Sequence, residues 1–482
     1  MRRLGAHIFR VYPDLETGCT NARGDPGFLA EYYMTPTVTN EPFHTEEYPR
    51  GSFTTLMNTK VTGCQTVRFT TTYRPDVSGS HYLSFSGLGP SKLFINDQLI
   101  AEQTEPTKDA MGFLLGVQDE LHMQYPFEAG KPYTMTIITQ PSPTSNAELY
   151  LLDDQISTHL GLIHQSEMES DILAEATALA READLAIVFV GNTTQWETEG
   201  QDLSTMTLPA PTTSTDTSSS SQNTLIAHVA AANPHATIVV NTTGVPIECP
   251  WLPAVPAFLQ AWYAGQETGN AILDVLLGDV CPSGKLPVSW PRRYEDTGCF
   301  GHFGLDSFES RRVEYVEGVF VGYRWFDEWW GGEREVRFPF GFGLSYTAFE
   351  ISDAKVEGAV ERDDEGATVK VSAKVKNTGP VPGAETVQVY LAPPPPVVPS
   401  SGTPPRPQKS LVGFAKVELR PGEEKEVQVQ FGRSEAAYWD EGLAAWRVTG
   451  GKYEVLVATS SHPRDCKVRL GMCVQEEFTF AA

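Results

Sequence analysis

Carboxylates and an aromatic side chain follow directly after an apolar run in the middle of this sequence. The run LAIVFV at residues 185–190 predicts a strand buried on both faces, and Gly191 ends it. The polar stretch that follows contains one aromatic and three acidic residues: Trp196, Glu197, Glu199 and Asp202. Because ligands of open α/β sheets bind where loops leave the carboxyl ends of strands, this stretch is a candidate site.

These side chains together suit chemistry on sugars. An aromatic ring can stack on one face of a pyranose, and a carboxylic acid can protonate the oxygen of a glycosidic bond. The same residues also suit a solvated acidic connection, since acidic side chains are mostly exposed in proteins. Composition alone leaves both interpretations open.

The length and charge of the chain narrow the choice of partners. Its 482 residues exceed what one core can organise and predict three domains of roughly 150 residues each. The apolar content of 40% is typical of a globular protein rather than a disordered one. A formal net charge of −25 repels phosphate backbones and anionic membranes, so neither nucleic acid nor a membrane is expected as a partner. A neutral sugar is compatible with this charge.

The cysteines and histidines indicate no metal site. Seven cysteines without a CxxC pair argue against a disulfide framework and a zinc site. Cys466 and Cys473 could pair, but scattered reduced thiols are favoured. His159 and His164 are five residues apart, which favours a surface role over metal binding, and no nucleotide-binding motif occurs. We therefore expect no metal and no cofactor.

The N-terminal residues lack the apolar core of a secretory signal, and no apolar run approaches the ~18 residues of a membrane helix. Localisation stays open between a cytoplasmic protein and a secreted one made as part of a longer precursor.

Strand and helix patterns divide the sequence into a connector and three domains. Residues 1–24 predict a connector, and residues 25–155 contain short alternating strands with turn signals, which favour a β-sandwich. Residues 165–347 alternate strands with helices, including a predicted helix at 167–183, and indicate a parallel-sheet α/β sandwich covered on both faces. In residues 350–482 the alternation returns and predicts an immunoglobulin-like sandwich. The fold class is therefore multidomain, α/β plus all-β.

The last domain shows the clearest alternation. Every second residue is apolar in two runs, which places the following side chains on inward faces: Val369, Val371, Ala373, Val375, Val387, Val389 and Leu391. Because this domain has no concentrated cluster of acids, histidines or cysteines, we expect it to act as structural support.

Three runs in the first sandwich, GFLAEYY, YRPDVSGSHYLSF and LFINDQLI, resemble the protective-antigen-type carbohydrate-binding domain of toxins, adhesins and some glycosidases. A structural sandwich without a ligand is the alternative. The resemblance does not locate the binding loops.

Longer runs between residues 180 and 392 resemble family 3 of the glycoside hydrolases, in particular the β-glucosidases with an inserted protective-antigen-type domain. They include READLAIVFVGNTTQWETEGQD, AWYAGQETGNAILDVLLGDVCPSGKLPVSWP and VKNTGPVPGAETVQVYL, and they occur in the family's order. With the two flanking sandwiches, the last being fibronectin type III-like, the resemblance covers nearly the whole chain.

The resemblance implies retaining hydrolysis of terminal β-linked glucose from glucosides or oligosaccharides, as in polysaccharide and cellulose degradation. The family uses a nucleophilic Asp on a (β/α)₈ barrel and an acid/base Glu on a loop of the following α/β sandwich. Glu199 is the candidate acid/base, because the family places this Glu ahead of a Leu-Pro or Ile-Pro pair, here Leu208-Pro209. Glu197 is the runner-up, and on an extended loop both side chains would point the same way.

The barrel has no counterpart in this sequence. No stretch resembles the nucleophile motif, and Ser352-Asp353 is a poor candidate. The sequence resembles the C-terminal portion of a β-glucosidase, with a small carbohydrate as substrate and a missing N-terminal barrel domain as the expected partner. Loss of one catalytic carboxylate predicts little or no turnover by this polypeptide alone. A non-catalytic carbohydrate-binding protein and a structural remnant without a ligand are the alternatives.

Overall fold

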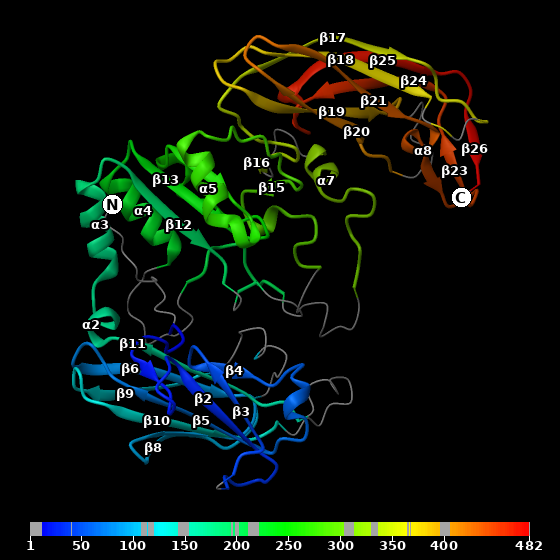
Figure 1. The fold of residues 1–482 in the computed structure, drawn as a ribbon. Helices are drawn as coiled ribbons and strands as arrows, with labels where there is room; N and C mark the ends of the chain where they lie inside the picture. The colour runs from blue at the N-terminus through cyan, green and yellow to red at the C-terminus, as the bar shows by residue number, and fades with distance from the viewer. Residues whose placement is uncertain are drawn as a thin grey trace. The chain divides into compact units, whose positions relative to one another are not determined.

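The computed structural model describes residues 12–39, 41–107, 113, 120–142, 154–193, 196–197, 202–210, 221–302, 313–328, 336–363, 366, 368–395 and 405–481. The chain divides into two compact units, each treated by itself below. Unit 1 comprises residues 1–203, 208–241 and 251–259, and unit 2 comprises residues 204–207, 242–250 and 260–482. Figure 1 labels the elements of both units.

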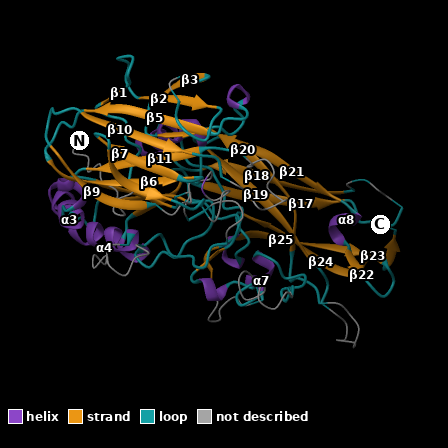
Figure 2. Cartoon of the chain, turned by 90° about the horizontal axis from the view of Figure 1, so that it is seen from below, coloured by secondary structure: helices purple, strands orange, loops and turns teal. Residues whose placement is uncertain are grey.

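Two antiparallel sheets form a β-sandwich in unit 1 (Figure 2). The larger sheet has the order β3-β2-β5-β10-β7-β8, with β1 paired to β5, and the smaller one has the order β4-β11-β6-β9. Their strands are β1 (Cys19–Thr20), β2 (Phe28–Tyr33), β3 (His44–Tyr48), β4 (Ser52–Thr54), β5 (Thr66–Tyr73), β6 (Gly79–Gly87), β7 (Ser91–Ile95), β8 (Gln98–Gln103), β9 (Leu121–Phe127), β10 (Tyr133–Thr139) and β11 (Ser157–Ile163).

The core of this sandwich follows from the two-residue period of its strands. In β5, Val67, Phe69 and Tyr73 are buried. The ring of Phe69 stacks on that of Phe28, with centroids 4.7 Å apart. Leu83, Phe85 and Leu160 of the smaller sheet belong to the same core, so residues of both sheets close one apolar core, as the alternating pattern predicts.

His159 stands on the face of β11 opposite to the core residues Leu160 and Leu162, but its side chain is only 15% exposed, so the predicted surface role is wrong. Its Nε2 is 2.9 Å from Asp14 Oδ1, and its Nδ1 is 2.9 Å from Glu120 Oε1. Burial by itself would lower the pKa of His159, but the hydrogen bonds to the two carboxylates outweigh burial and raise the pKa to about 9. Because Asp14 belongs to the connector, this ion pair ties the connector to β11.

The α/β part of unit 1 contains a three-stranded sheet of order β12-β13-β14. Its elements are α2 (Gln165–Met168), α3 (Ile172–Glu182), β12 (Ala186–Gly191), α4 (Gln222–Ala232), β13 (Thr237–Thr242) and β14 (Ala257–Gln260). The backbone N–H of Ala186 donates to the carbonyl of Ala236 at 2.8 Å. The first residues of β12 and β13 thus lie together, as in a parallel pair.

Two local predictions for this part need correction. The helix predicted over residues 167–183 is interrupted, because Asp171 accepts a hydrogen bond from the N–H of Ala174 and begins a new helix there. The strand predicted to be buried on both faces is buried on one. Val188 and Val190 are buried, whereas Leu185, Ile187 and Phe189 are 50%, 38% and 61% exposed. Helix α4 packs against β12, and α3 packs against α4. The described residues of this unit therefore leave the other face of β12 uncovered.

Unit 2 begins with short elements and ends in a second sandwich. The short elements are α5 (Thr268–Leu277), β15 (Trp290–Pro291), α7 (Tyr323–Asp327) and β16 (Val336–Phe338). The remaining strands are β17 (Phe349–Glu357), β18 (Val369–Asn377), β19 (Gly383–Ala392), β20 (Ser410–Leu419), β21 (Glu424–Phe431), β22 (Tyr438–Asp440), β23 (Ala445–Val448), β24 (Gly451–Ala458), β25 (Cys466–Val474) and β26 (Phe478–Phe480). They form sheets of order β17-β18-β21, β20-β19-β24-β25 and β22-β23-β26.

The inward faces predicted for the last sandwich are confirmed, since all seven apolar side chains are buried: Val369, Val371, Ala373, Val375, Val387, Val389 and Leu391. All seven cysteines of the chain are free. Cys466 and Cys473 both lie in β25, and a strand rises about 3.3 Å per residue, which places them about 23 Å apart. They cannot form a disulfide.

Within the described residues, no helix combines the length and the apolarity that a membrane span requires.

Candidate active site

Gln222, the first residue of α4, holds the carboxyl end of β12. Its side chain is buried, and both of its amide atoms bind the backbone of Gly191. The N–H of Gly191 donates to Gln222 Oε1 at 2.8 Å, and Gln222 Nε2 donates to the carbonyl of Gly191 at 2.9 Å. A side-chain amide thereby replaces a strand partner and fixes the point where the polar loop leaves the sheet.

The same residue holds the other end of the loop. The backbone N–H of Gln222 donates to the carbonyl of Pro209 at 3.4 Å, and the neighbouring Leu208 is 1% exposed. The polar loop between Gly191 and Pro209 thus starts and finishes on one buried glutamine. The sequence does not single out this residue, because a Gln at the start of a helix has no local signal that separates it from a solvated one.

Glu197 lies on this loop, close to the end of β12. The backbone N–H groups of Trp196 and Glu197 both donate to the carbonyl of Thr193, each at 2.9 Å. Asn192 Nδ2 donates to Glu197 Oε2, also at 2.9 Å. A neutral amide from the strand end therefore orients this carboxyl group.

Two polar atoms that can still form hydrogen bonds lie near Glu197. Asn192 Oδ1 and Thr193 Oγ1 are buried, and neither has a hydrogen-bond partner in the part of the chain that the structure describes. Glu199, the candidate acid/base, lies outside the described residues, and so do residues 194–195, 198 and 200–201. Asp202, at the far side of the loop, is exposed. The choice between Glu199 and Glu197 therefore stays a prediction.

The aromatic residues in the motif runs mostly serve packing. Trp251 Nε1 donates to Asn223 Oδ1 at 2.8 Å, and Trp290, which is fully buried, donates to the carbonyl of Ile247 at 2.6 Å. Trp325 Nε1 donates to the carbonyl of Asp296 at 3.3 Å.

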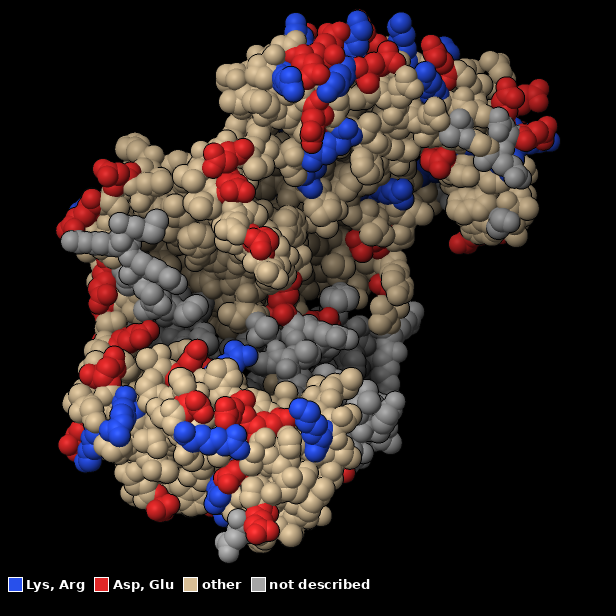
Figure 3. Space-filling model, in the orientation of Figure 1, with Lys and Arg blue, Asp and Glu red and all other residues tan. Residues whose placement is uncertain are grey.

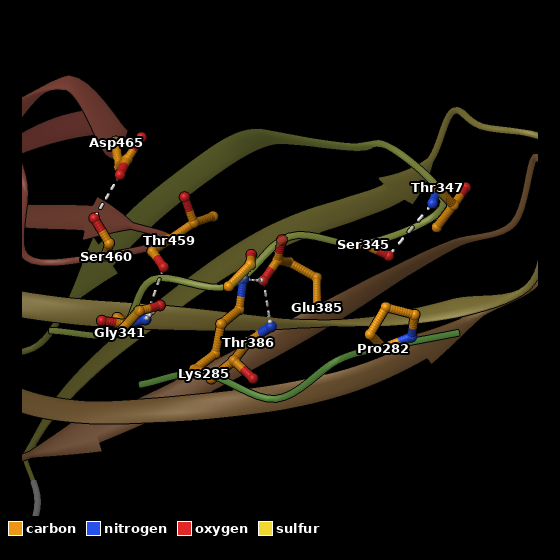
Figure 4. Close-up of polar contacts among 12 residues, drawn as sticks. Pro282, Lys285, Gly341, Ser345, Thr347, Glu385, Thr386, Thr459, Ser460 and Asp465 are labelled. Carbon is orange, nitrogen blue, oxygen red and sulfur yellow. Dashed lines mark hydrogen bonds and ion pairs between the residues drawn. The ribbon is translucent and has the colours of Figure 1, made fainter. Parts of the chain in front are cut away.

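The run PSGKLPVSWP is bound to the last sandwich (Figure 4). Lys285 Nζ lies 2.8 Å from Glu385 Oε1 on β19 and donates to the carbonyl of Gly343 at 3.1 Å. Gln388 Nε2, also on β19, donates to the carbonyls of Gly341 at 3.2 Å and of Thr459 at 2.8 Å. Lys285 is therefore engaged in holding the segment around Gly341 on β19.

Asp353 does not have the surroundings of a catalytic nucleophile. Its carboxylate lies 2.8 Å from Lys374 Nζ and is 60% exposed. The hydrogen bond from Lys374 lowers the pKa of Asp353. Among the described residues, no group of three or more His, Cys, Asp or Glu side chains could hold a metal ion.

Comparison with known protein families places three domains on the chain. Residues 25–159 match the PA14 domain, residues 110–346 match the Glycosyl hydrolase family 3 C-terminal domain, and residues 385–461 match the Fibronectin type III-like domain. These matches confirm the resemblances seen in the sequence. The first two ranges overlap, so the predicted boundary near residues 155–165 stays a prediction.

Similar proteins share these domains over almost the whole chain. Beta-glucosidase B of Emericella nidulans is 41% identical over 477 residues, which are 98% of this chain and 54% of that protein. The crystal structure of a beta-glucosidase from Kluyveromyces marxianus in complex with glucose superposes with a TM-score of 0.80 at 32% identity, covering all of this chain and 54% of its own. A beta-glucosidase structure from Bifidobacterium adolescentis superposes over 64% of this chain with a TM-score of 0.54 at 36% identity. The chain spans about half the length of the curated relatives it matches.

Proposed function

We propose that this chain, which carries the C-terminal domains of family 3 β-glucosidases, supplies the acid/base loop of a retaining β-glucosidase. The nucleophile would come from a barrel domain that the sequence does not contain. The substrate would be a terminal β-linked glucose of a glucoside or oligosaccharide. The beta-glucosidase names of the relatives, which match this chain over half their own length, support the reaction class.

The single observation that carries the proposal is the anchoring of the polar loop. The side-chain amide of Gln222 binds Gly191 and its backbone N–H binds Pro209, so one buried residue holds both ends of a long acidic loop. Glu197 is oriented on this loop by Asn192, and Glu199 follows two residues later. A general acid must be held in place to reach a glycosidic oxygen, and this anchoring provides such support.

We assign the acid/base role to Glu199, with Glu197 as the runner-up. In a retaining enzyme this residue first protonates the leaving oxygen and then removes a proton from water, which hydrolyses the covalent glycosyl intermediate. The second carboxylate has to lie ~5 Å away. Since Asp353 is paired with Lys374, the described residues offer no supported candidate, which favours a nucleophile on other polypeptide.

The uncovered face of β12 also supports a missing partner. Ile187 and Phe189 of β12, and Leu185 just before the strand, stand at alternate positions and remain exposed. Since each of these side chains is already about half buried, covering the remainder would contribute roughly 1 kcal/mol each. We infer that the proposed N-terminal portion covers this face.

Hydrolysis of an aryl β-glucoside tests the proposal. The chain is assayed alone and after mixing with the separately expressed N-terminal portion of the Emericella nidulans relative. We expect turnover only in the mixture, and Glu199→Gln should lower it by about 10²–10⁴-fold. Added azide, which needs no general base to attack the intermediate, should restore a large part of the rate of Glu199→Gln.

Controls separate the two glutamates. Glu350→Gln, an exposed change on β17, should leave turnover unchanged. Loss and azide rescue with Glu197→Gln instead would move the role to Glu197. Brisk turnover by the chain alone would refute the missing nucleophile, and silence of the mixture would refute the enzymatic proposal.

A second candidate function is carbohydrate binding without turnover. A pocket on the first sandwich, with threonine and charged side chains in its lining, favours it. Sugar binding in the absence of any hydrolysis would support this function, whereas absence of both binding and turnover would favour a structural role.

A further inference from the structure

Helix α2 belongs to the segment that links the first sandwich to α3. It begins two residues after the end of β11, has only four residues and packs against β6 (Figure 1). Gln165 Oε1 accepts a hydrogen bond from the N–H of Ser80 at 2.7 Å, and Glu169 Oε1 accepts one from the Tyr82 hydroxyl group at 3.2 Å. Because so short a helix is not stable by itself, its contacts with β6 decide whether it forms.

His81 on β6 makes a further contact with α2, and this contact fixes its protonation state. The residue is 1% exposed. Its Nε2 lies 2.9 Å from the carbonyl oxygen of Val77, and its Nδ1 accepts from the backbone N–H of Gln165 at 3.2 Å. A carbonyl only accepts and a backbone N–H only donates, so Nε2 carries a hydrogen and Nδ1 carries none. The contact therefore requires the neutral imidazole.

The ring of His81 is packed on both faces and at its edge. It stacks on the ring of His164 with centroids 4.5 Å apart, and the ring of Phe127 lies 5.7 Å away. Gly79 provides the space, because a Cβ atom there would lie 3.1 Å from His81 Cε1 and 3.2 Å from Gln165 Oε1. The imidazole is thus held in the orientation that accepts from Gln165.

The charged groups around His81 come from both sides of the contact. Asp76, in the turn before β6, is 73% exposed and lies 3.6 Å from Nε2 of His164, which precedes α2. Glu169 lies beyond Gln165, whose Nε2 donates to its carboxylate at 3.2 Å. Burial lowers the pKa of His81, and a charge on His164 lowers it further, against opposing contributions from the Val77 carbonyl and Asp76.

A proton on Nδ1 would remove the contact. It would place an N–H group opposite the N–H of Gln165, and it would add a positive charge beside the ring of His164. Since the pKa is lowered in the folded chain, the contribution of His81 is fully present above about pH 6.5 and is lost as the pH falls below that value. This is opposite to His159, whose contribution is lost as the pH rises.

We propose that His81 is an acid-sensitive switch, which holds α2 on β6 when it is neutral and releases residues 164–171 when it is protonated. Release would leave the covalent link between the first sandwich and α3 without its docked helix. The switch is independent of the proposed reaction, because none of its residues belongs to the acid/base loop.

Hydrogen exchange of the full chain between about pH 5 and 8, corrected for the intrinsic pH dependence of exchange, tests the switch. Protection of peptides that cover residues 164–171 should be constant above about pH 6.5 and should fall up to about tenfold for each pH unit below it. Peptides from β5 and β24 should keep their protection. Equal loss in those peptides would show global unfolding and would contradict a local switch.

A variant without a titrating ring isolates the role of His81. His81→Asn retains an acceptor oxygen near the position of Nδ1, so protection of residues 164–171 at about pH 5 should exceed that of the unaltered chain at least tenfold. His228→Gln, a change of an exposed histidine on α4, is the control and should leave the pH dependence unchanged. Constant protection in the unaltered chain, or a pH dependence that persists in His81→Asn, would overturn the proposal.

The protonation state can also be measured without any variant. In nitrogen NMR spectra of the chain with labelled histidine, His81 should carry its hydrogen on Nε2 at about pH 7.5 and should titrate with a midpoint below about 6.5. A hydrogen on Nδ1 at that pH, or a midpoint above about 6.5, would refute the switch even if His81→Asn fails to fold.

Discussion

The sandwiches and the α/β region of this chain differ in how completely they bury their apolar faces. In the first sandwich, Phe28, Phe69 and Leu93 are at most 1% exposed, and residues of both sheets contribute to one core. In the α/β region, Ile187 and Phe189 on β12 are 38% and 61% exposed. The same two-residue alternation thus closes a core in one region and leaves an apolar face open in the other.

Surface charge follows the same division. Figure 3 shows Lys, Arg, Asp and Glu side chains gathered over the outer surface of the last sandwich, whereas uncharged atoms dominate the α/β region in the same view. In unit 2, the helix α5 likewise exposes Leu273 and Leu277, which occupy one helical face and are 51% and 68% exposed. Each sandwich therefore buries its apolar side chains within its own core, whereas the α/β region exposes apolar surface suited to a further partner.

The largest effect should come from the closed core. Phe69→Ala removes a fully buried ring that stacks on Phe28, so the first sandwich should lose about 3–5 kcal/mol of its free energy of unfolding. Hydrogen exchange of peptides from β5 measures this loss. A change below about 1 kcal/mol would contradict the tight packing of this region.

The second largest effect on stability should come from the ion pair between Lys285 and Glu385 of the last sandwich. Lys285→Ala leaves Glu385, whose side chain is 11% exposed, without its cation and should cost about 2–4 kcal/mol. Tryptophan fluorescence during denaturation reports the loss, because no tryptophan precedes Trp196. The double change Lys285→Met and Glu385→Gln should recover much of the stability, and failure to recover it would show that Lys285 acts through something other than this pair.

The ion pairs of His159, which bind the connector to the first sandwich, should make its stability depend on pH. The pKa of His159 is raised to about 9 in the folded chain, against about 6.5 when unfolded. Its contribution is fully present below pH ~6.5 and is lost as the pH rises through about 9, a loss of roughly 3 kcal/mol. Hydrogen exchange of β11 peptides at several pH values measures it, and His159→Gln should remove the dependence. An equal pH dependence in that variant would assign it to another group.

Loss of the Gln222 side-chain amide should have a moderate effect on stability. Gln222→Leu removes two hydrogen bonds to Gly191, and we expect a loss of about 1–3 kcal/mol in stability together with faster proteolysis of the loop. Gln260→Leu, a change of the same type outside the loop, is the control for global destabilisation. Unchanged loop proteolysis in Gln222→Leu would show that the loop is held by other contacts.

The smallest effect should occur on the open face. Phe189→Ser removes a ring that is 61% exposed, so the stability of the isolated chain should change by less than about 0.5 kcal/mol. In the mixture with an N-terminal portion, the same change should weaken association at least tenfold. A large loss of stability in the isolated chain would mean that this face is already covered.

The sequence predicted the fold well wherever its hydrophobic pattern is compatible with only one structure. Alternation in β18 and β19 identified the buried side chains of the last sandwich, because a half-buried strand repeats every two residues. The continuous run LAIVFV predicted burial on both faces of β12, and the structure buries one. The hydrophobic pattern indicates which faces of a strand can be buried, but not which part of the protein covers them.

The candidate site was predictable only in part. The residue types on the loop after β12 indicated sugar chemistry, and the order of the motif runs indicated the family. Gln222 and the partners of His159 could not be predicted, because each acts on residues 30 or more positions away in the chain. Such contacts leave no local signature.

The sequence alone therefore determined the two sandwiches, the alternation of strands and helices between them, and an acidic loop after β12. These features are predictable because strand period, helix period and residue chemistry are local properties. The tertiary structure alone decided that β12 has an open face, that one glutamine anchors both ends of the loop, and that His81 accepts a hydrogen bond from the start of α2. These features depend on distant segments meeting in space, and the free energy of such meetings is set by packing and burial rather than by neighbours in the chain.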